Sequence, residues 1–544
     1  MLTQISLQPL DKVYLYSNFL MEEHSESWDI KIGSINNLYV LSLAAFCILL
    51  IACMNFMNLS TAMAGCRGKE IGVRKVMGSQ KKDIIKQFLG ESTVIAFLSL
   101  IFALMLVYQF LPVFNRLSGK QLSIQGLFNI DILPGIIGVT LFTGLISGSY
   151  PALFLSSLKS VDVFKKPVFL RRKNRLPLRK ILVVLQFSIA IVVIICTTVF
   201  YRQVHYMQGR YGGFDSDNTI VALDWAFAEH REAVKNELLQ HPNVIGVSHS
   251  EGPGNYFNPT SDVNWPGKNP DEELIFYTFT TDPDFAKVFK SEILAGRFFS
   301  EDKPTDESNY VLNETAAKLT GIESPVGKRC SINGKAGMII GVLKDRSFGP
   351  PLYPVQPLVF LINYKHPRFN IKVDDAAHIP IVLDYINKIR KEFANYKPVS
   401  YRFVKDDLEK YYRKERNLSR IFGNITFLII FLACLGLFGL SAFHAERKTK
   451  EIGIRKVFGS SVPGIVVLLT GEFIKWIVLA NIIAWVVAYF ISHRWLRDYV
   501  YRIDIGFDIF IFSAVLVFAI AILTVGFQAV KSARTNPVDA LRYE

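Results

Sequence analysis

The sequence predicts a multi-pass α-helical membrane protein with about seven spans and one large α+β domain outside the bilayer. Half of the 544 residues are hydrophobic, and they gather in long runs rather than in the short runs of soluble cores. Lys and Arg, which outnumber the acidic residues to give a net charge of +14, cluster beside these runs. Between the fourth and fifth runs, residues 202–418 have an ordinary globular composition.

Seven apolar runs are long enough for the ~20 helical residues that cross a hydrocarbon core of ~30 Å. They are residues 38–63, 93–114, 130–155, 181–201, 421–443, 473–491 and 507–530. Their central thirds carry essentially no charged side chain. Ion-coupled carriers keep such charges for function, so the sequence argues against a secondary carrier. Gly148 and Gly526 lie in the third run of each half, where we expect close helix contacts.

Basic residues are unevenly distributed between the connecting segments. The segments after the first, third and fifth runs hold more Lys and Arg than the other short segments, and the tail after the seventh run holds Lys531, Arg534 and Arg542. The positive-inside rule therefore predicts that these segments and the C-terminus are cytoplasmic. The N-terminus and residues 202–418 are then expected outside. Because the charge follows the runs, we expect it to orient the chain in a lipid bilayer and not to bind nucleic acid.

The outer segment alternates helical and strand patterns. Helices are expected at 229–240, 313–319 and 376–393, and strands at 244–248, 330–332, 337–342 and 399–404. Asn333-Gly334 is a hairpin signal between two of these strands. From residue 406 a helical pattern runs without proline into the fifth apolar run, which predicts a rod of about 60 Å. Cys330 is the single cysteine of the segment, so no disulfide can form within it.

A charged phrase occurs twice, after the first run and after the fifth. An offset of 381 residues relates Glu70 to Glu451, and the same offset relates Glu91 to Glu472. The copies run Lys69-Glu70-Ile71-Gly72-Val73-Arg74-Lys75-Val76-Met77-Gly78 and Lys450-Glu451-Ile452-Gly453-Ile454-Arg455-Lys456-Val457-Phe458-Gly459. An offset of 377 relates Asp162 to Asp539 near the ends of the two third spans. The repeat predicts two parallel three-span units.

Each phrase predicts a short amphipathic helix that ends at Gly78 or Gly459, with Ser79 capping the helix that follows the first copy. The residues alone leave two interpretations open: an interfacial helix on anionic headgroups, or a docking element for a cytoplasmic protein, which duplication favours. The expected docking residues are Glu70, Ile71, Gly72, Arg74, Lys75, Gly78, Glu451, Ile452, Gly453, Arg455, Lys456 and Gly459, and Glu91 and Glu472 form an expected pair where the chain enters the membrane.

No catalytic motif accompanies these features. The sequence contains no GxxxxGK[ST], GxSxG or HExxH pattern and no Cys/His metal spacing. We therefore expect no enzyme, no metal site and no cofactor in this chain.

Several motifs together resemble the FtsX-like permeases, the MacB/LolCE class of ABC-transporter membrane subunits. They are the two phrases, the Gly-Glu after each, and Pro-Val-Asp-Ala-Leu-Arg at 537–542. Residues 55–62 resemble the tandem permeases common in Bacteroidetes-type bacteria, and residues 294–298 are similar to part of the MacB-type periplasmic core domain. Tandem members usually begin with a further span and a first periplasmic domain, so the resemblance predicts an N-terminally truncated chain.

The resemblance implies a domain division and an inner-membrane location. Residues 1–36 would be the remnant of a first periplasmic domain, and 37–166 the first FtsX-like three-span unit. Residues 167–201 would form a basic linker and the fourth span. A periplasmic α+β core domain on helical stalks would occupy 202–418, and the second FtsX-like unit 419–544.

The resemblance also implies partners. A cytoplasmic ABC ATPase dimer would bind ATP and Mg²⁺ and dock on the two phrases, and the chain would form a homodimer, or a heterodimer with a second permease. A periplasmic partner is compatible with this arrangement. The substrate would be a peptide, a lipoprotein or an antibiotic-like compound. A signalling or scaffold protein that regulates a periplasmic partner without export is the alternative, followed by a secondary carrier.

Overall fold

The computed structural model describes residues 9–16, 35–118, 121–157, 178–211, 217–223, 227, 230–250, 258–269, 272, 274–346, 354–363, 368–393, 400–497 and 499–534. The chain divides into two compact units. The helical unit comprises Met1–Phe200, Asn417–Arg494 and Asp504–Glu544, and the α/β unit comprises Tyr201–Arg416 and Trp495–Ile503. The predicted remnant at 1–36 and the basic linker after residue 157 lie largely outside the described residues.

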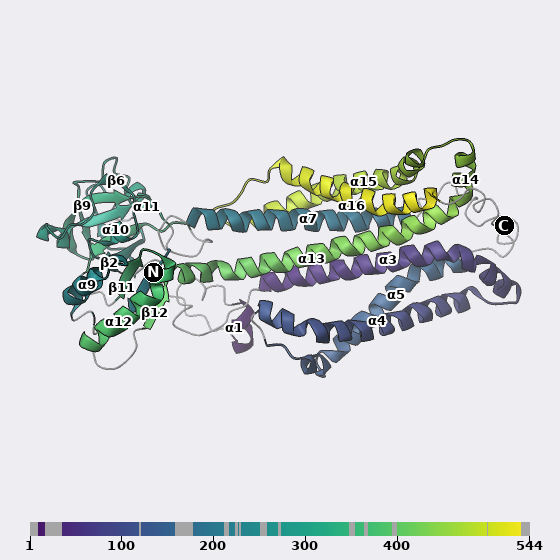
Figure 1. Cartoon of the computed structure of the whole chain (residues 1–544), viewed down its shortest axis with the longest axis horizontal. Helices are drawn as coiled ribbons and strands as arrows, with labels where there is room; N and C mark the ends of the chain where they lie inside the picture. Colours follow the sequence, from purple (N-terminus) through teal and green to yellow (C-terminus); the bar gives the residue numbers. More distant parts are fainter. Residues whose placement is uncertain are drawn as a thin grey trace. The chain divides into compact units, whose positions relative to one another are not determined.

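Seven long helices dominate the described part of the helical unit, and each is long and apolar enough to cross a membrane. The helices of this unit are α1 (Leu10–Tyr16), α3 (Ile35–Val76), α4 (Lys81–Ser118), η1 (Ile124–Phe128), α5 (Leu133–Ser156), α7 (Leu178–Tyr211), α13 (Val404–Arg447), α14 (Thr449–Val457), α15 (Val462–Leu496) and α16 (Phe507–Ala533) (Figure 1). Each predicted apolar run lies on one of the seven long helices, so the predicted spans are confirmed. Helices α7 and α13 continue into the α/β unit.

Helices α4 and α5 approach each other closely because α5 carries glycine at the crossing. A Cβ built on Gly148 would lie 1.9 Å from Ser92 Oγ, and one on Gly144 would lie 2.8 Å from Thr93 Cα. The predicted close contact at Gly148 is confirmed. The prediction for Gly526 is wrong, because a Cβ there meets nothing within 4 Å among the described residues. The offset of 377 aligns Gly148 with Val525, so the two glycines do not occupy equivalent positions.

Helices α3, α7 and α13 pack around one apolar cluster, whose buried members are Ile51, Ala190, Ile429 and Ala433. Polar side chains cross between the helices and bond to backbone carbonyls. Asn55 Nδ2 donates to the Leu432 carbonyl at 2.6 Å, and Gln186 Nε2 donates to the Ala433 carbonyl at 3.2 Å. Such bonds hold helices together where burial of apolar surface cannot, because lipid is as apolar as the helices.

The α/β unit contains two sheets. One has four strands in the order β12-β1-β11-β2, and the other has eight, with β3-β5-β10-β7-β9-β8-β4 in line and β6 paired to β9. The strands are β1 (Thr219–Leu223), β2 (Val244–His249), β3 (Asn258–Thr260), β4 (Val263–Asn264), β5 (Phe276–Thr281), β6 (Ile293–Gly296), β7 (Tyr310–Asn313), β8 (Arg329–Ile332), β9 (Lys335–Leu343), β10 (Leu358–Ile362), β11 (Arg368–Val373) and β12 (Ser400–Phe403). The four-stranded sheet is antiparallel, whereas β5/β10 and β7/β9 pair in parallel.

Helices α9 (Arg231–Gln240) and α12 (Ile379–Phe393) share a core with the four-stranded sheet, and Val234, Phe369 and Ile386 are buried in it. The remaining elements are α10 (Phe285–Val288), α11 (Glu314–Leu319), η2 (Pro304–Ser308) and η3 (Ala376–His378). The helices and strands expected in this segment are all present, with ends shifted by a few residues. Asn333 and Gly334 both have positive φ, 50° and 75°, which is the conformation of the predicted hairpin turn.

Two ionic clusters stabilise the α/β unit internally. Lys235 Nζ lies 2.5 Å from Asp284, 3.2 Å from Glu301 and 3.7 Å from Asp282. Burial raises the pKa of Asp282 to about 7, although the Lys235 charge opposes the shift.

The second cluster follows a turn at Gly296, whose φ is +72°. Both terminal guanidinium nitrogens of Arg297 donate to the Asp306 carboxylate, at 2.5 and 2.8 Å. Burial alone would raise the pKa of Asp306, but hydrogen bonds from Arg297 and Asn309 outweigh it and hold the pKa below its ordinary value.

Two helices cross the boundary between the units. Helix α13 has 44 residues, about 66 Å at 1.5 Å per residue, which confirms the rod predicted from residue 406. Helix α7 extends past the fourth apolar run to Tyr211. Near its end, the fully buried Gln203 donates to the Tyr501 carbonyl at 2.6 Å and accepts from the Ile503 N–H at 2.9 Å. Gln203 therefore ties the α15–α16 connection to α7.

Candidate functional site

The two copies of the charged phrase form helical elements in the helical unit. The first repeat element, residues 70–78, is the C-terminal part of α3 and is continuous with the first span. The second repeat element, residues 451–459, is mostly a separate nine-residue helix, α14, after a break at Lys448. Figure 1 shows α14 as its own short helix beyond the end of α13. The predicted separate short helix is therefore found in the second copy, whereas in the first it is fused to the span.

Both elements end in the same way. Gly78 and Gly459 have φ of 101° and 84°, which glycine adopts without steric cost. The N–H of Gly78 bonds to the Lys75 carbonyl, and the N–H of Ser79 bonds to the Arg74 carbonyl, at 3.2 and 3.0 Å. The second element repeats both bonds, from Gly459 to Lys456 and from Ser460 to Arg455, each at 2.9 Å. This is the Schellman arrangement, and it confirms the glycine ends predicted from the sequence.

The predicted N-cap of the following helix is wrong by one residue. Helix α4 begins at Lys81, and the carbonyl of Gln80, one residue after Ser79, accepts from the N–H of Asp83. The N–H of Gln80 instead bonds to the Asp83 carboxylate at 2.9 Å, which satisfies a donor that the first turn leaves free. In the second copy, the hydroxyl of Ser461 accepts from Gly464 at 3.4 Å.

One isoleucine anchors each element to the helical unit. Ile71 is buried with Ile84, Phe88, Ala152 and Leu155. Its equivalent, Ile452, is buried with Ile465, Leu469, Ala529 and Ala533. Four positions correspond between the two clusters. The offset of 381 relates Ile71, Ile84 and Phe88 to Ile452, Ile465 and Leu469, and the offset of 377 relates Ala152 to Ala529. Gly72 and Gly453 are also buried, so four of the predicted docking residues face the helical unit and position the element.

Each phrase carries an ion pair whose two side chains are partly exposed. Glu70 and Arg74 form an ion pair at 2.7 Å, and Glu451 and Arg455 repeat it at 2.8 Å. Exposed pairs at this spacing stabilise a helix by only about 0.3–0.5 kcal/mol, so they add little to the stability of either element. Arg74 also bonds to Gln87.

Lys75 differs from its neighbours, because its Nζ donates to the Ser156 carbonyl at 2.7 Å and ties the first element to α5. Partial burial, with the nearby Lys81 charge, lowers the pKa of Lys75. Lys456 is half-buried at the equivalent position.

Glu91 and Glu472 each form an ion pair with a basic residue from the preceding helical segment. Arg67 lies 2.7 Å from Glu91, and Lys448, its equivalent by the offset of 381, lies 3.5 Å from Glu472. Glu472 also contacts His444 Nε2 at 2.7 Å. The two glutamates thus link the segment before each repeat element to the helix after it.

Sequence reasoning missed an exposed apolar stripe on each element. Val73, Val76 and Met77 are exposed on the first, and Ile454, Val457 and Phe458 are exposed at the equivalent positions of the second. Met77 is 82% exposed and Phe458 is 85% exposed. The spacing i, i+3, i+4 places each set on one helix face, and this spacing was the available signal. Grouped exposed apolar side chains mark interaction sites with proteins or membranes more often than isolated exposed residues do.

Comparison with known families assigns most of the chain. The profile of the FtsX-like permease C-terminal family matches residues 42–159 and 424–537, and that of the MacB-like periplasmic core domain matches residues 181–389. The first family therefore matches twice, once over each set of three spans.

Several known proteins are similar to parts of this chain. The macrolide export ATP-binding/permease protein MacB of Bdellovibrio bacteriovorus is 28% identical over 48% of this chain and 43% of its own length. An ABC transporter permease of Bacillus subtilis, YvrN, is 19% identical over 49% of this chain and 70% of its own. This chain thus spans less than half of the first relative. The periplasmic region of MacB from Actinobacillus actinomycetemcomitans is similar at 16% identity, covering 38% of this chain and 97% of that one, with a TM-score of 0.27.

Seven membrane-length helices, two matches to one permease family over equivalent three-helix sets, and a MacB-like domain between them agree with one another. The chain is a multi-pass membrane protein that belongs to the FtsX-like permease family of ABC transporters and carries a MacB-like periplasmic core domain.

Proposed function

We propose that this chain is a permease subunit whose two repeat elements bind a separate cytoplasmic ABC ATPase dimer, so that ATP hydrolysis moves the periplasmic domain. The observation that carries the proposal is the duplicated exposed stripe. Met77 and Phe458 project from equivalent elements, each anchored by a buried isoleucine and ended by the same turn. Two similar surfaces on one chain suit two copies of one partner.

A protein partner explains the composition of these surfaces better than lipid headgroups do. Each stripe lies on an element that also carries an exposed Glu–Arg pair, Glu70–Arg74 or Glu451–Arg455. Anionic headgroups attract the arginine but repel the glutamate. An apolar patch with polar and charged groups of both signs around it is typical of a protein–protein interface.

The proposal sets an orientation for the chain. The repeat elements and the C-terminus lie in the cytoplasm, and the N-terminus and residues 202–418 lie in the periplasm. The excess of Lys and Arg after the first, third and fifth spans supports this orientation. We keep 37–166 and 419–544 as the two three-span units and 202–418 as the periplasmic core domain.

We further propose that the substrate is handled outside the inner membrane and is a peptide, a lipoprotein or an antibiotic-like compound. The central thirds of the spans carry essentially no charge, so they lack the charged side chains that ion-coupled carriers keep for function. The name of the Bdellovibrio relative includes macrolide export, which supports the antibiotic-like class.

The test is whether ATPase activity co-purifies with the chain. The full-length tagged protein is purified from native membranes in mild detergent, and vanadate-sensitive ATP hydrolysis is measured. Full burial of a large apolar side chain contributes about 1.5–3 kcal/mol, so the Met77→Asp, Phe458→Asp double variant should lose at least tenfold of the co-purified activity. Lys82→Glu changes an exposed charge on α4 and should retain it. Undiminished activity with a correctly inserted double variant would refute the docking claim.

A further inference from the structure

The connection between α15 and α16 belongs to the α/β unit, although most of both helices lies in the helical unit. Helix α15 ends at Leu496 and α16 begins at Phe507, and the segment Trp495–Ile503 is part of the α/β unit. Gln203 of α7, which is in the α/β unit as well, binds the backbone of this connection at Tyr501 and Ile503. The second three-span set, which comprises α13, α15 and α16, is therefore attached to the α/β unit at its α15–α16 connection.

The side chain of Tyr501 extends this attachment to the eight-stranded sheet. Its Oη accepts a hydrogen bond from the Val355 N–H at 3.3 Å. Val355 lies three residues before β10, an inner strand that pairs with both β5 and β7. The amide of Asn313 donates to the Gln356 carbonyl and accepts from the Leu358 N–H, both at 2.8 Å. Because these bonds fix the residues between, a displacement of Val355 reaches β10 directly.

The first three-span set, α3, α4 and α5, holds its outer connection by the same device but from a different helix. Asn115 of α4 donates to the Leu122 carbonyl at 2.8 Å and accepts from the Leu122 N–H at 3.1 Å. In each set one amide side chain thus binds the connection, but in the second set that amide comes from α7. Neither offset aligns Tyr501 with a tyrosine, since 381 gives Lys120 and 377 gives Ile124. The hydroxyl that reaches Val355 is therefore a feature of the second set.

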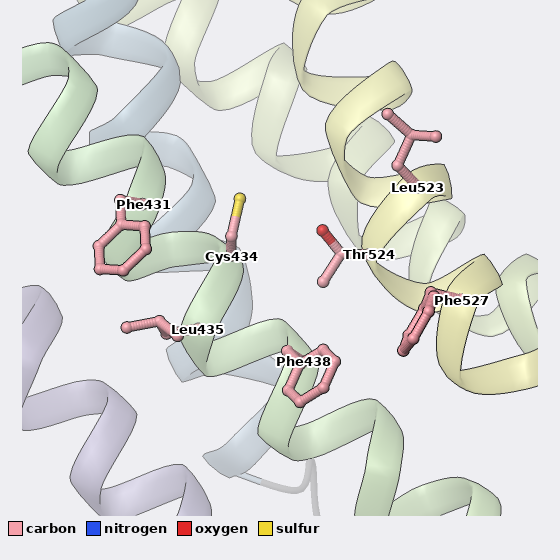
Figure 2. A pocket seen from close by; sticks show the side chains of 7 residues that line it. All are labelled: Phe431, Cys434, Leu435, Phe438, Leu523, Thr524 and Phe527. Carbon is pink, nitrogen blue, oxygen red and sulfur yellow. The ribbon is translucent and has the colours of Figure 1, made fainter. Parts of the chain in front are cut away.

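Helices α13 and α16 do not pack closely along their whole length. An apolar groove of about 400 Å³ lies between them. Figure 2 shows Cys434 and Phe438 of α13 and Thr524 and Phe527 of α16 among the side chains that line it. Close packing transmits displacement between neighbouring elements, so among the described residues the groove interrupts the lateral route from α16 to α13. The connection at Tyr501 offers a route that does not depend on this packing.

We propose that Tyr501 is a positioning residue whose hydroxyl couples the second three-span set to β10. When α15 and α16 move, their connection carries the movement to Val355, and β10 follows. The eight-stranded sheet then responds more strongly to the second repeat element, which precedes α15, than to the first. This inference rests on the proposed function, in which a bound ATPase moves the spans, although the contacts at Tyr501 can be tested without the ATPase.

A double-mutant cycle measures the coupling without any ATPase. Gln203→Leu releases the connection from α7, and Tyr501→Phe removes only the hydroxyl. Hydrogen–deuterium exchange of peptides that cover residues 354–362 is followed in the full-length protein in nanodiscs. The net effect of one hydrogen bond is a factor of about two to ten in a local opening equilibrium, so each single variant should raise exchange by that factor. The double variant should exchange no faster than the faster single variant.

Two controls accompany the cycle. Tyr401→Phe makes the same chemical change at a side chain of β12 that is 46% exposed, and it should leave exchange of residues 354–362 within twofold of the wild-type value. Helix α12 is the internal control, and its exchange should stay within twofold in every variant. If the factors of the two single variants multiply in the double variant, or if exchange of α12 rises as much as that of β10, the proposal is overturned.

The protein purified with its ATPase supplies a readout that a purely structural role of Tyr501 would not change. ATP with vanadate should alter exchange of residues 354–362 in the wild type and in Tyr401→Phe. Tyr501→Phe should lose at least half of this alteration and keep the co-purified ATPase activity. A full response in Tyr501→Phe would overturn the proposal. If no ATPase activity co-purifies with the wild type, the proposed function fails instead, and the double-mutant cycle alone decides the coupling.

Discussion

Replacing Ile452 with alanine should release the second repeat element while leaving the rest of the fold intact. Ile452 is the buried anchor of α14, and a nine-residue helix has little stability of its own. Loss of a buried isoleucine costs about 2–5 kcal/mol. At the low end of that range, the population of the open form of α14 rises about 30-fold, because 1.4 kcal/mol corresponds to a factor of ten.

The chain supplies a matched variant for this prediction. Ile71→Ala removes the same side chain from the first element, but that element is continuous with a 42-residue helix. It also keeps the bond from Lys75 to the Ser156 carbonyl. We therefore expect its opening to rise by tenfold at most. Val457→Ala, at an exposed position of α14, should leave the opening of the second element within twofold of the wild-type value.

Hydrogen–deuterium exchange of the full-length protein in nanodiscs measures both elements at once, through peptides that cover residues 70–78 and 449–459. Faster exchange of the second element in Ile452→Ala, with a smaller change of the first element in Ile71→Ala, is the expected pattern. If Ile452→Ala exchanges like the wild type, or if the two elements respond equally, then the anchoring role or the difference in continuity is wrong.

Three further outcomes follow from the packing and charge of the described residues. The pKa of Asp282 is about 7 in the folded protein, above its ordinary value. As pH rises, the Asp282 carboxyl therefore loses its proton at a lower pH in the unfolded state than in the folded state. The unfolding free energy of the α/β unit should therefore fall by about 2–3 kcal/mol between pH 5 and pH 7, and Asp282→Asn should remove this slope in hydrogen exchange of β5. Gly148→Leu should separate α4 from α5, since even a Cβ would lie 1.9 Å from Ser92 Oγ, and should lower the melting temperature in detergent, whereas the same change at Gly526 should not. Asp306→Ala should cost the α/β unit about 2–3 kcal/mol, below the full cost of breaking a buried pair because Arg297 still reaches water, as measured by denaturant unfolding.

The spans and the ends of the repeat elements could be predicted because each depends on local sequence. A run of about 20 apolar residues has few alternatives to a membrane helix, and Gly78 and Gly459 are the residues that can end a helix with positive φ. The hairpin at Asn333-Gly334 is equally local. These features depend on a few adjacent residues, so tertiary packing did not change them.

The face that each repeat element exposes could not be predicted, because it depends on contacts distant in sequence. Ile71 and Val73 are apolar residues two positions apart in the phrase, yet Ala152 and Leu155 of α5 bury the first and leave the second exposed. The break in the helix at Lys448 could not be predicted from local sequence either. The first copy has almost the same sequence, yet it continues as one helix. The strand order of the larger sheet likewise depends on pairings between segments far apart in the chain.

The bonds of Gln203 have a consequence for how freely the chain can vary. Its side-chain amide forms hydrogen bonds with the backbone of Tyr501 and Ile503 and not with their side chains. Many residue types could therefore occupy those two positions without loss of the hydrogen bonds. Position 203 itself is restricted. A glutamate carboxylate could not donate the hydrogen bond to the Tyr501 carbonyl, and a leucine side chain could neither donate that bond nor accept the one from the Ile503 N–H. Among homologues, we therefore expect an amide side chain at position 203 and a variable sequence in the α15–α16 connection that it binds.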